Sequence, residues 1–218
     1  MTGLQRHHVV VLDTPGIVYE EWPPEPLLRP WVAVRWRMRA TADTEFRVLP
    51  DGCMDVIGDD VVGSFPVAQV FTLQRGDVTS GTRLHPGAFP ALTGVPASQL
   101  VGLDVPLRQL VPAGSSLRSL ALDAAPPDPV VAAAWALPDL RSLRRETGYG
   151  ERQLRRRVAA ATGHSPKRLQ RIRRMQQVLR SGRGRSWAET AQEHGYYDEA
   201  YMANDVKALA GATPHVLV

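Results

Sequence analysis

The sequence lacks several features that would decide its class at once. It has a single cysteine, Cys53, which excludes an internal disulfide and a four-cysteine zinc site. It has no apolar run near the ~18 residues of a membrane helix, and its first residues lack the long apolar core of a secretory signal peptide. We therefore expect a cytoplasmic protein without a membrane span.

Motifs for nucleotides and metals are also missing from the sequence. It contains no glycine-rich phosphate loop and no dinucleotide-binding turn in a convincing strand–helix setting. His7 and His8 are adjacent but have no further ligand residues near them in the sequence. We expect neither a metal nor another cofactor.

The basic residues are concentrated at one end of the chain. With 218 residues, it has room for one large domain or two small ones, and its formal net charge is +4. Residues 139–218 hold 16 Lys or Arg against 8 Asp or Glu, whereas residues 1–138 carry a net charge of −4. A basic end indicates a polyanionic partner; the alternative is a solvated, arginine-rich helical face.

The amino-terminal half is predicted to be mostly β. Residues 31–40 place Val34, Trp36 and Met38 on one face and arginines on the other, as in a half-buried strand. Asp51-Gly52 is typical of a tight turn between strands. Short helices in residues 97–112 and 115–126 are expected to close this domain. Further strands are predicted in the segments HHVVVL, FRVLP, MDVIG and VAQVFTL.

From about residue 130 the pattern changes to a helical period. One apolar stripe joins Leu169, Ile172, Met175 and Leu179. N-caps are predicted at Ser165, Ser186 and Asp198, and helix ends at Gly148, Gly163, Gly182, Gly195 and Gly211. The fold class is α+β: a β-rich sensory or partner-binding domain over 1–124, a linker and helix start over 125–136, and an all-α domain over 137–218.

The helices form two helix-turn-helix units, over about 139–159 and 187–209, joined by the helix at 166–180. The glycine in each turn permits a positive φ angle. Tyr149 and Tyr196 are expected to pack under the two turns, and Leu154 and Val158 to face inward. In such a unit the second helix enters the major groove of DNA.

These residues resemble the DNA-binding domain of the AraC/XylS transcription regulators. The resemblance covers about 80 residues in two segments, SLRRETGYGERQLRRRVAAATGHSP and WAETAQEHGYYDEAYMANDVKALAGATP. It implies a bacterial one-component regulator that binds double-stranded DNA, with RNA polymerase as a further partner. Two units on one rigid helix could occupy successive major-groove segments, so the protein is expected to act as a monomer or a homodimer.

The resemblance also implies a set of DNA-contacting residues. Asn204 departs from the family, where arginine is common, and Glu199 and Asp205 add negative charge to the second unit. Met202 and Val206 replace bulky aromatic residues. The first unit should therefore supply most of the affinity, and the alternative for the second is contact with phosphates only. The predicted DNA-binding residues are Arg152, Gln153, Arg155, Arg156, Lys167, Arg168, Arg171, Glu199, Tyr201, Asn204 and Lys207.

The amino-terminal half resembles an uncharacterised sensory domain that precedes such tails. The segments RVLPDGCMDVIGDD and GTRLHPGAFPALTG carry this resemblance. It implies a mostly β domain, with a cupin-like barrel by analogy, and a pocket for a small-molecule effector. The candidate ligand-binding residues are Trp31, Trp36, Arg47, Asp51, Asp55, Arg83 and His85.

Two alternatives to a ligand-controlled regulator stay open. In the first, the protein binds DNA constitutively and is regulated by protein–protein contact through its N-terminal domain. In the second, Cys53 is the nucleophile of an enzyme, which requires an activating base or a positive environment. A buried structural thiol fits the sequence better, and we expect no enzymatic activity.

Overall fold

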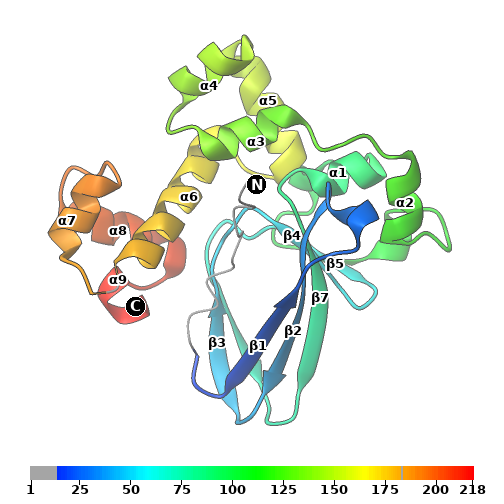
Figure 1. Ribbon diagram of the computed structural model, residues 1–218, viewed down its shortest axis with the longest axis horizontal. Helices are drawn as coiled ribbons and strands as arrows, with labels where there is room; N and C mark the ends of the chain where they lie inside the picture. Colours follow the sequence, from blue (N-terminus) through cyan, green and yellow to red (C-terminus); the bar gives the residue numbers. More distant parts are fainter. Residues whose placement is uncertain (1–13, 183) are drawn as a thin grey trace.

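The computed structural model describes residues 14–182 and 184–218, and in this part the chain forms a β-rich N-terminal region followed by helices. In Figure 1 the strands occupy one end of the molecule and the helices from α3 onward lie across and beside the other. The predicted α+β class is confirmed. The likeness to a cupin barrel stays a prediction.

The described strands form two antiparallel sheets. The larger has the order β1-β2-β7-β4-β5-β8 and the smaller pairs β3 with β6. Their bounds are β1 Ile17–Trp22, β2 Val32–Ala40, β3 Thr44–Val48, β4 Met54–Ile57, β5 Asp60–Val62, β6 Gln69–Leu73, β7 Val78–Leu84 and β8 Asp104–Pro106. The predicted strand in residues 7–12 lies outside the described residues.

The central strands β2 and β7 show why one was predicted and the other was not. In β2, Trp36 and Met38 are buried and the alternating arginines are exposed, which confirms the predicted alternation. Its partner β7 has the sequence VTSGTRL, whose apolar pattern is weak. Gly81 in β7 is required by packing, because a Cβ atom there would lie 2.6 Å from the Trp36 ring.

The prediction of a helix in residues 97–112 is wrong. This segment forms the short turns η2 (Ala97–Gln99) and η3 (Leu107–Gln109) with strand β8 between them. Gly102, with φ of +68°, and Pro106 interrupt helical geometry. The other predicted helix is present as α2 (Leu117–Asp123), beside η1 (Pro26–Leu28) and α1 (Ala88–Thr93).

The predicted turn at Asp51-Gly52 is present but does not close a hairpin. Gly52 has φ of +74°, and an Asp51 side-chain oxygen accepts a hydrogen bond from the Cys53 amide. The flanking strands β3 and β4 belong to different sheets. The loop between them therefore carries the chain across the domain rather than back along a neighbour.

The helical region confirms the predicted helices closely. The described helices are α3 Pro129–Ala136, α4 Leu140–Thr147, α5 Glu151–Thr162, α6 Pro166–Ser181, α7 Trp187–Glu193, α8 Glu199–Ala210 and α9 Pro214–Leu217. Ser165 and Asp198 cap α6 and α8 through their side chains. Ser186 is the N-cap of α7, but among the described residues its hydroxyl makes no capping hydrogen bond. The sequence did not predict α9, and it placed only a helix start where α3 lies.

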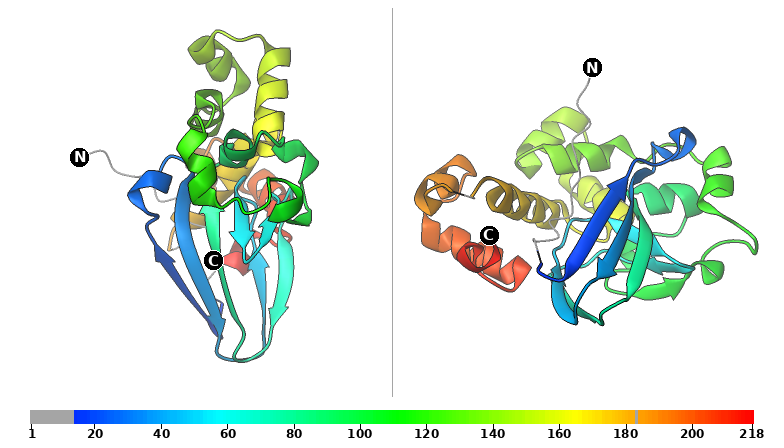
Figure 2. Two further views of the ribbon diagram at one scale, coloured as in Figure 1. Left: turned by 90° about the vertical axis from the view of Figure 1, so that its right-hand side faces the viewer. Right: turned by 60° about the horizontal axis from the view of Figure 1, so that its bottom comes forward.

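Helix α6 joins the two helix-turn-helix units through two apolar clusters. Leu169 packs with the first unit, while Ile172, Met175 and Leu179 pack with the second, as the apolar stripe predicted. Leu49, from the loop between β3 and β4, is only 2% exposed and belongs to the second cluster. The core of the second unit is therefore completed by the N-terminal region, which Figure 2 shows lying against it.

Leu49→Ala is expected to lower the free energy of unfolding by about 2–4 kcal/mol, because truncation leaves a cavity in this shared core. Urea unfolding of the full chain measures the change. Val70→Ala is the matched control, since Val70 is 46% exposed on β6, and should change the free energy by less than about 0.5 kcal/mol. Equal effects of the two substitutions would show that Leu49 does not contribute to the shared core.

Candidate DNA-binding interface

The first helix-turn-helix unit consists of α4 and α5. Gly148, with φ of +71°, ends α4, and Tyr149 packs against the cluster beneath it as predicted. The Arg157 guanidinium lies 4.7 Å from the centre of the Tyr149 ring and pairs with Asp128, the N-cap of α3. Arg157 therefore holds α3 against the unit.

The exposed face of α5 carries Arg152, Gln153, Arg155 and Arg156. Leu154 and Val158 are fully buried, as predicted. Arg155 forms an ion pair with Glu151 one turn earlier, so its guanidinium is less free than its neighbours. The exposed arginines stand in the N-terminal half of the helix, where a recognition helix meets base edges.

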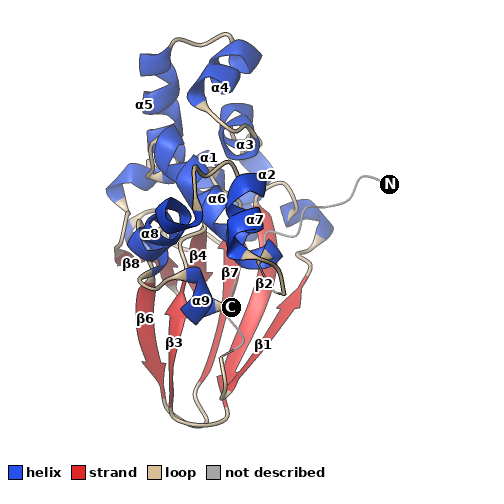
Figure 3. Ribbon diagram, turned by 90° about the vertical axis from the view of Figure 1, so that its left-hand side faces the viewer, coloured by secondary structure: helices blue, strands red, loops and turns tan. Residues whose placement is uncertain are grey.

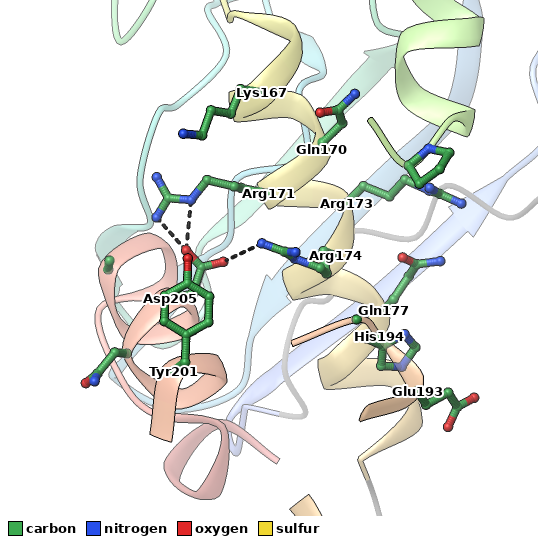
Figure 4. Close-up of a pocket in the computed structure, with 14 residues that line it drawn as sticks. Lys167, Gln170, Arg171, Arg173, Arg174, Gln177, Glu193, His194, Tyr201 and Asp205 are labelled. Carbon is green, nitrogen blue, oxygen red and sulfur yellow. Dashed lines mark hydrogen bonds and ion pairs between the residues drawn. The ribbon is translucent and has the colours of Figure 1, made fainter. Parts of the chain in front are cut away.

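The second unit consists of α7 and α8, and a buried carboxylate organises it. Asp205 is 8% exposed and accepts hydrogen bonds from Arg171 Nε at 2.8 Å and from the Tyr196 hydroxyl at 3.0 Å. The Arg174 guanidinium lies 4.1 Å from the centre of the Tyr196 ring and 3.6 Å from Asp205. Burial and the neighbouring carboxylate raise the pKa of Tyr196. The network joins α6, the turn and α8 (Figure 4).

This network corrects the interpretation of Asp205. The sequence suggested that its carboxylate adds negative charge to the recognition surface. The structure instead places it on the inner side of α8, where two arginines of α6 neutralise it. Arg171, predicted to contact DNA, is bonded to this carboxylate, and its side chain is 31% exposed.

A groove of about 920 Å³ runs between α6 and the second unit. It brings together four of the predicted DNA-binding residues, Lys167, Arg171, Tyr201 and Asn204, and Figure 4 shows the first three of these from α6 and α8. The remaining predicted residues do not line it. Arg168 is half-buried near His164, Lys207 is exposed, and Glu199 lies 3.7 Å from His215.

The sequence interpretation missed three arginines. Arg141, Arg144 and Arg145 are exposed on α4 and surround a hollow of about 330 Å³ at the turn Gly148–Gly150. The available signal was their position in LRSLRRE, off the apolar positions Leu140 and Leu143. These arginines are additional candidates for phosphate contacts.

The structure brings together only some of the predicted ligand-binding residues. Trp36 Nε1 donates to Asp55 at 2.7 Å, and Arg83 contacts both Asp55 and Asp51. The other three residues lie elsewhere. Trp31 Nε1 donates to the Ala125 carbonyl, Arg47 donates to the Ala210 carbonyl, and His85 follows β7 with its amide bonded to the Trp31 carbonyl.

The Cys53 thiol does not have the environment of a nucleophile. It is 5% exposed, and burial raises its pKa well above the ordinary value. The described residues contain no cluster of histidine, cysteine and carboxylate side chains suited to a metal, and His7 and His8 lie outside them. Within the same residues, no helix has the length and apolar character to cross a membrane.

The two units and the exposed basic helix define a DNA-binding protein of the helix-turn-helix class. Residues 143–217 match the family model of a helix-turn-helix domain, and residues 20–106 match a domain of unknown function (DUF6597). No curated protein and no solved structure matches the chain. The chain has the organisation of an AraC-family regulator, with an AraC-type DNA-binding domain after an uncharacterised domain.

The corner between α5 and α6 gives a pH prediction. His164 is 4% exposed, its Nε2 atom has no hydrogen-bond partner among the described residues, and burial together with Arg168 lowers its pKa from 6.5 to about 4. Between these values the unfolded chain binds the proton more readily. The folded state is therefore not penalised for its neutral His164 above pH 6.5, and it loses stability relative to the unfolded chain as the pH falls toward 4.

We expect the free energy of unfolding to fall by about 2 kcal/mol from pH 7.5 to pH 5 because of His164. Urea unfolding at both pH values measures this loss, and His164→Gln should remove it. Gln153→Ala is the control, because it changes an exposed side chain that does not titrate and should leave the pH dependence unchanged. A His164→Gln variant with the parent's pH dependence would show that folding does not lower the pKa of His164.

Proposed function

We propose that the protein is a sequence-specific transcriptional regulator in which α5 provides most of the base contacts and α8 orients the complex. The observation that carries this proposal is the difference between the two recognition helices. The exposed face of α5 presents three arginines, whereas α8 presents Tyr201 and Asn204 and begins with Glu199. Arginine binds guanine bidentately or pairs with phosphate. The side chains of α5 are therefore expected to bind DNA more strongly than those of α8.

Both units belong to one chain and share α6 as a rigid connection. Such an arrangement allows one molecule to occupy two successive major-groove segments without a partner copy. The groove between α6 and α8 contributes Lys167 and Arg173 between the two units. We infer that these cations contact the phosphates that separate the two base-contacting segments.

The N-terminal domain is proposed to control DNA binding through a small molecule. A cavity of about 480 Å³, within the range of ligand pockets, lies between its two sheets and contains Trp36, Asp55 and Arg83 from the predicted set. A ligand that favours one arrangement of the two domains would shift the population able to bind DNA.

Selection from a randomised duplex pool, with sequencing of the bound fraction and a salt series, tests the DNA-binding proposal. Two enriched motifs about one helical turn apart would show that both units contact bases. One motif would restrict base contacts to a single unit. Binding without enrichment that weakens steeply with salt would show attraction to phosphates alone and would refute sequence specificity.

Arg156→Ala is expected to weaken binding to the selected site by about 1–3 kcal/mol, because it removes a side chain from the exposed face of α5. Fluorescence anisotropy of the labelled duplex measures the affinity. Arg37→Ala removes the same charge from an exposed position on β2 and should leave it nearly unchanged. Equal affinities for the two variants at every salt concentration would place Arg156 outside the interface.

A further inference from the structure

The cavity between the two sheets is lined mainly by apolar groups. Five aromatic side chains contribute to its wall: Tyr19, Trp36, Phe46, Phe65 and Phe71. Tyr19 stacks with Trp36, and Phe71 lies between Phe46 and Phe65 with ring centres 5.7 and 6.2 Å away. The rings come from both sheets and from the segment before β6, so a bound molecule would contact aromatic faces on several sides.

The charged groups at the cavity do not balance. Arg83 is 5% exposed and lies 3.1 Å from Asp55 and 3.5 Å from Asp51. One guanidinium thus faces two carboxylates, of which Asp55 lines the cavity and Asp51 does not. The exposed Asp104 is the second carboxylate of the lining. Burial raises the pKa of Asp55, and Arg83 and the hydrogen bond from Trp36 oppose this shift. An unmatched charge in a largely apolar site is unfavourable.

We propose that this cavity binds an organic cation with a flat aromatic body. Aromatic faces attract cations, and a positive ligand would offset the unmatched carboxylate. An anion finds no comparable partner, because Arg83 is the only cationic residue among the described residues that line the cavity. Its Nη1 atom makes no hydrogen bond within the described residues, but it is enclosed, with less than 1 Å² accessible.

The cavity wall continues into contacts with both recognition helices. Residues 62–69 contribute Val62, Phe65 and Gln69 to the lining. In the same segment, the Ser64 hydroxyl donates to the Thr162 carbonyl at the end of α5, at 3.0 Å. The Ala68 amide donates to the Leu209 carbonyl near the end of α8, at 2.7 Å. Figure 3 shows α8 and α9 on the side of β3 and β6.

A ligand that displaces Phe65 would therefore act on one segment bonded to the C-terminal ends of α5 and α8. The carbonyls at these ends lack partners within their helices, so bonds from outside decide where the ends lie. The occupied cavity would change the separation of the two recognition helices. This regulatory part rests on the proposed function, whereas cation binding itself does not.

Three probes of similar shape and different charge test the ligand class: N-methylquinolinium, methylnaphthalene and naphthoate. Calorimetry on the full chain should show the cation binding about tenfold more tightly than the neutral probe, with naphthoate weakest. Asp55→Asn should remove most of the cation's advantage and leave the neutral probe's affinity unchanged. Thr79→Phe, which fills the cavity, should weaken both.

Tighter binding of naphthoate than of the cation would overturn the proposal. So would unchanged cation binding in Thr79→Phe. If Asp55→Asn does not fold, Asp104→Asn provides the charge test at an exposed position. The cation's advantage over methylnaphthalene must fall in that variant, and an undiminished advantage would refute the electrostatic argument.

Spin labels at Arg152→Cys and Ala200→Cys, in a chain carrying Cys53→Ala, test the coupling without DNA. Saturating N-methylquinolinium should shift the distance between the labels. Ser64→Ala should reduce the shift while the cation still binds, and Ser80→Ala, at an exposed serine of β7, should not. An unchanged distance in the parent would refute the coupling. A shift in a protein that selects no DNA sequence would retain this inference and refute the proposed function.

Discussion

The arrangement of the two recognition helices depends on hydrogen bonds made to their C-terminal ends by the N-terminal domain. Ser64 bonds to the last residue of α5, and Ala68 and Arg47 bond to the last two carbonyls of α8. Arg47 also places a positive charge at the negative end of the α8 dipole. The opposite, N-terminal halves of both helices, which are proposed to contact bases, are left available. The N-terminal domain therefore contacts the DNA-binding units at the C-terminal ends of α5 and α8.

The second unit is held together differently from the first. Its core includes Met202 and Val206, and Leu49 of the N-terminal region packs in the same cluster. The buried Asp205 adds a polar tie between α6 and α8. Breaking such a pair leaves an uncompensated buried charge. The position of α8 thus depends on groups from three parts of the chain. Helix α5 packs on α3, α4 and α6 and also on α1 and η2 of the N-terminal region, and it is bonded to Ser64 at its end.

The sequence predicted the local structure of the helical region well, since caps, glycine ends and apolar stripes are encoded within a few residues. Ser165, Asp198 and the Leu169 stripe are examples. It predicted the β region less well. Strand β7 was missed because its two faces differ little in polarity, and Gly81 has a role only beside Trp36. The helix expected in residues 97–112 failed at Gly102 and Pro106.

The candidate sites show that contacts between residues far apart in the sequence were also difficult to predict. Outward positions on α5 follow from helical period, so its arginines were identified. The two arginine partners of Asp205 are 31 and 34 residues away, and no local pattern shows that its carboxylate faces inward. Likewise, Trp36, Asp55 and Arg83 meet at one cavity, while Trp31 and Arg47 belong to other contacts. The register of β4 and β7, which pairs Asp55 with Arg83, decides this grouping.

The two ends of each recognition helix differ in their contacts: the N-terminal half is exposed, and the C-terminal end is bonded to the N-terminal domain. In the proposed function, affinity for DNA depends on side chains in the exposed N-terminal half of α5, and screening by salt would weaken their attraction to DNA. The spacing between α5 and α8 depends on buried hydrogen bonds and apolar packing, which salt affects much less. If the N-terminal domain binds a ligand as proposed, the signal would reach this spacing through the bonds at the C-terminal ends of α5 and α8, away from the exposed arginines in the N-terminal half of α5. Control of this kind would change which DNA sequences are bound. It would have less effect on the nonspecific attraction between the protein and the DNA phosphates.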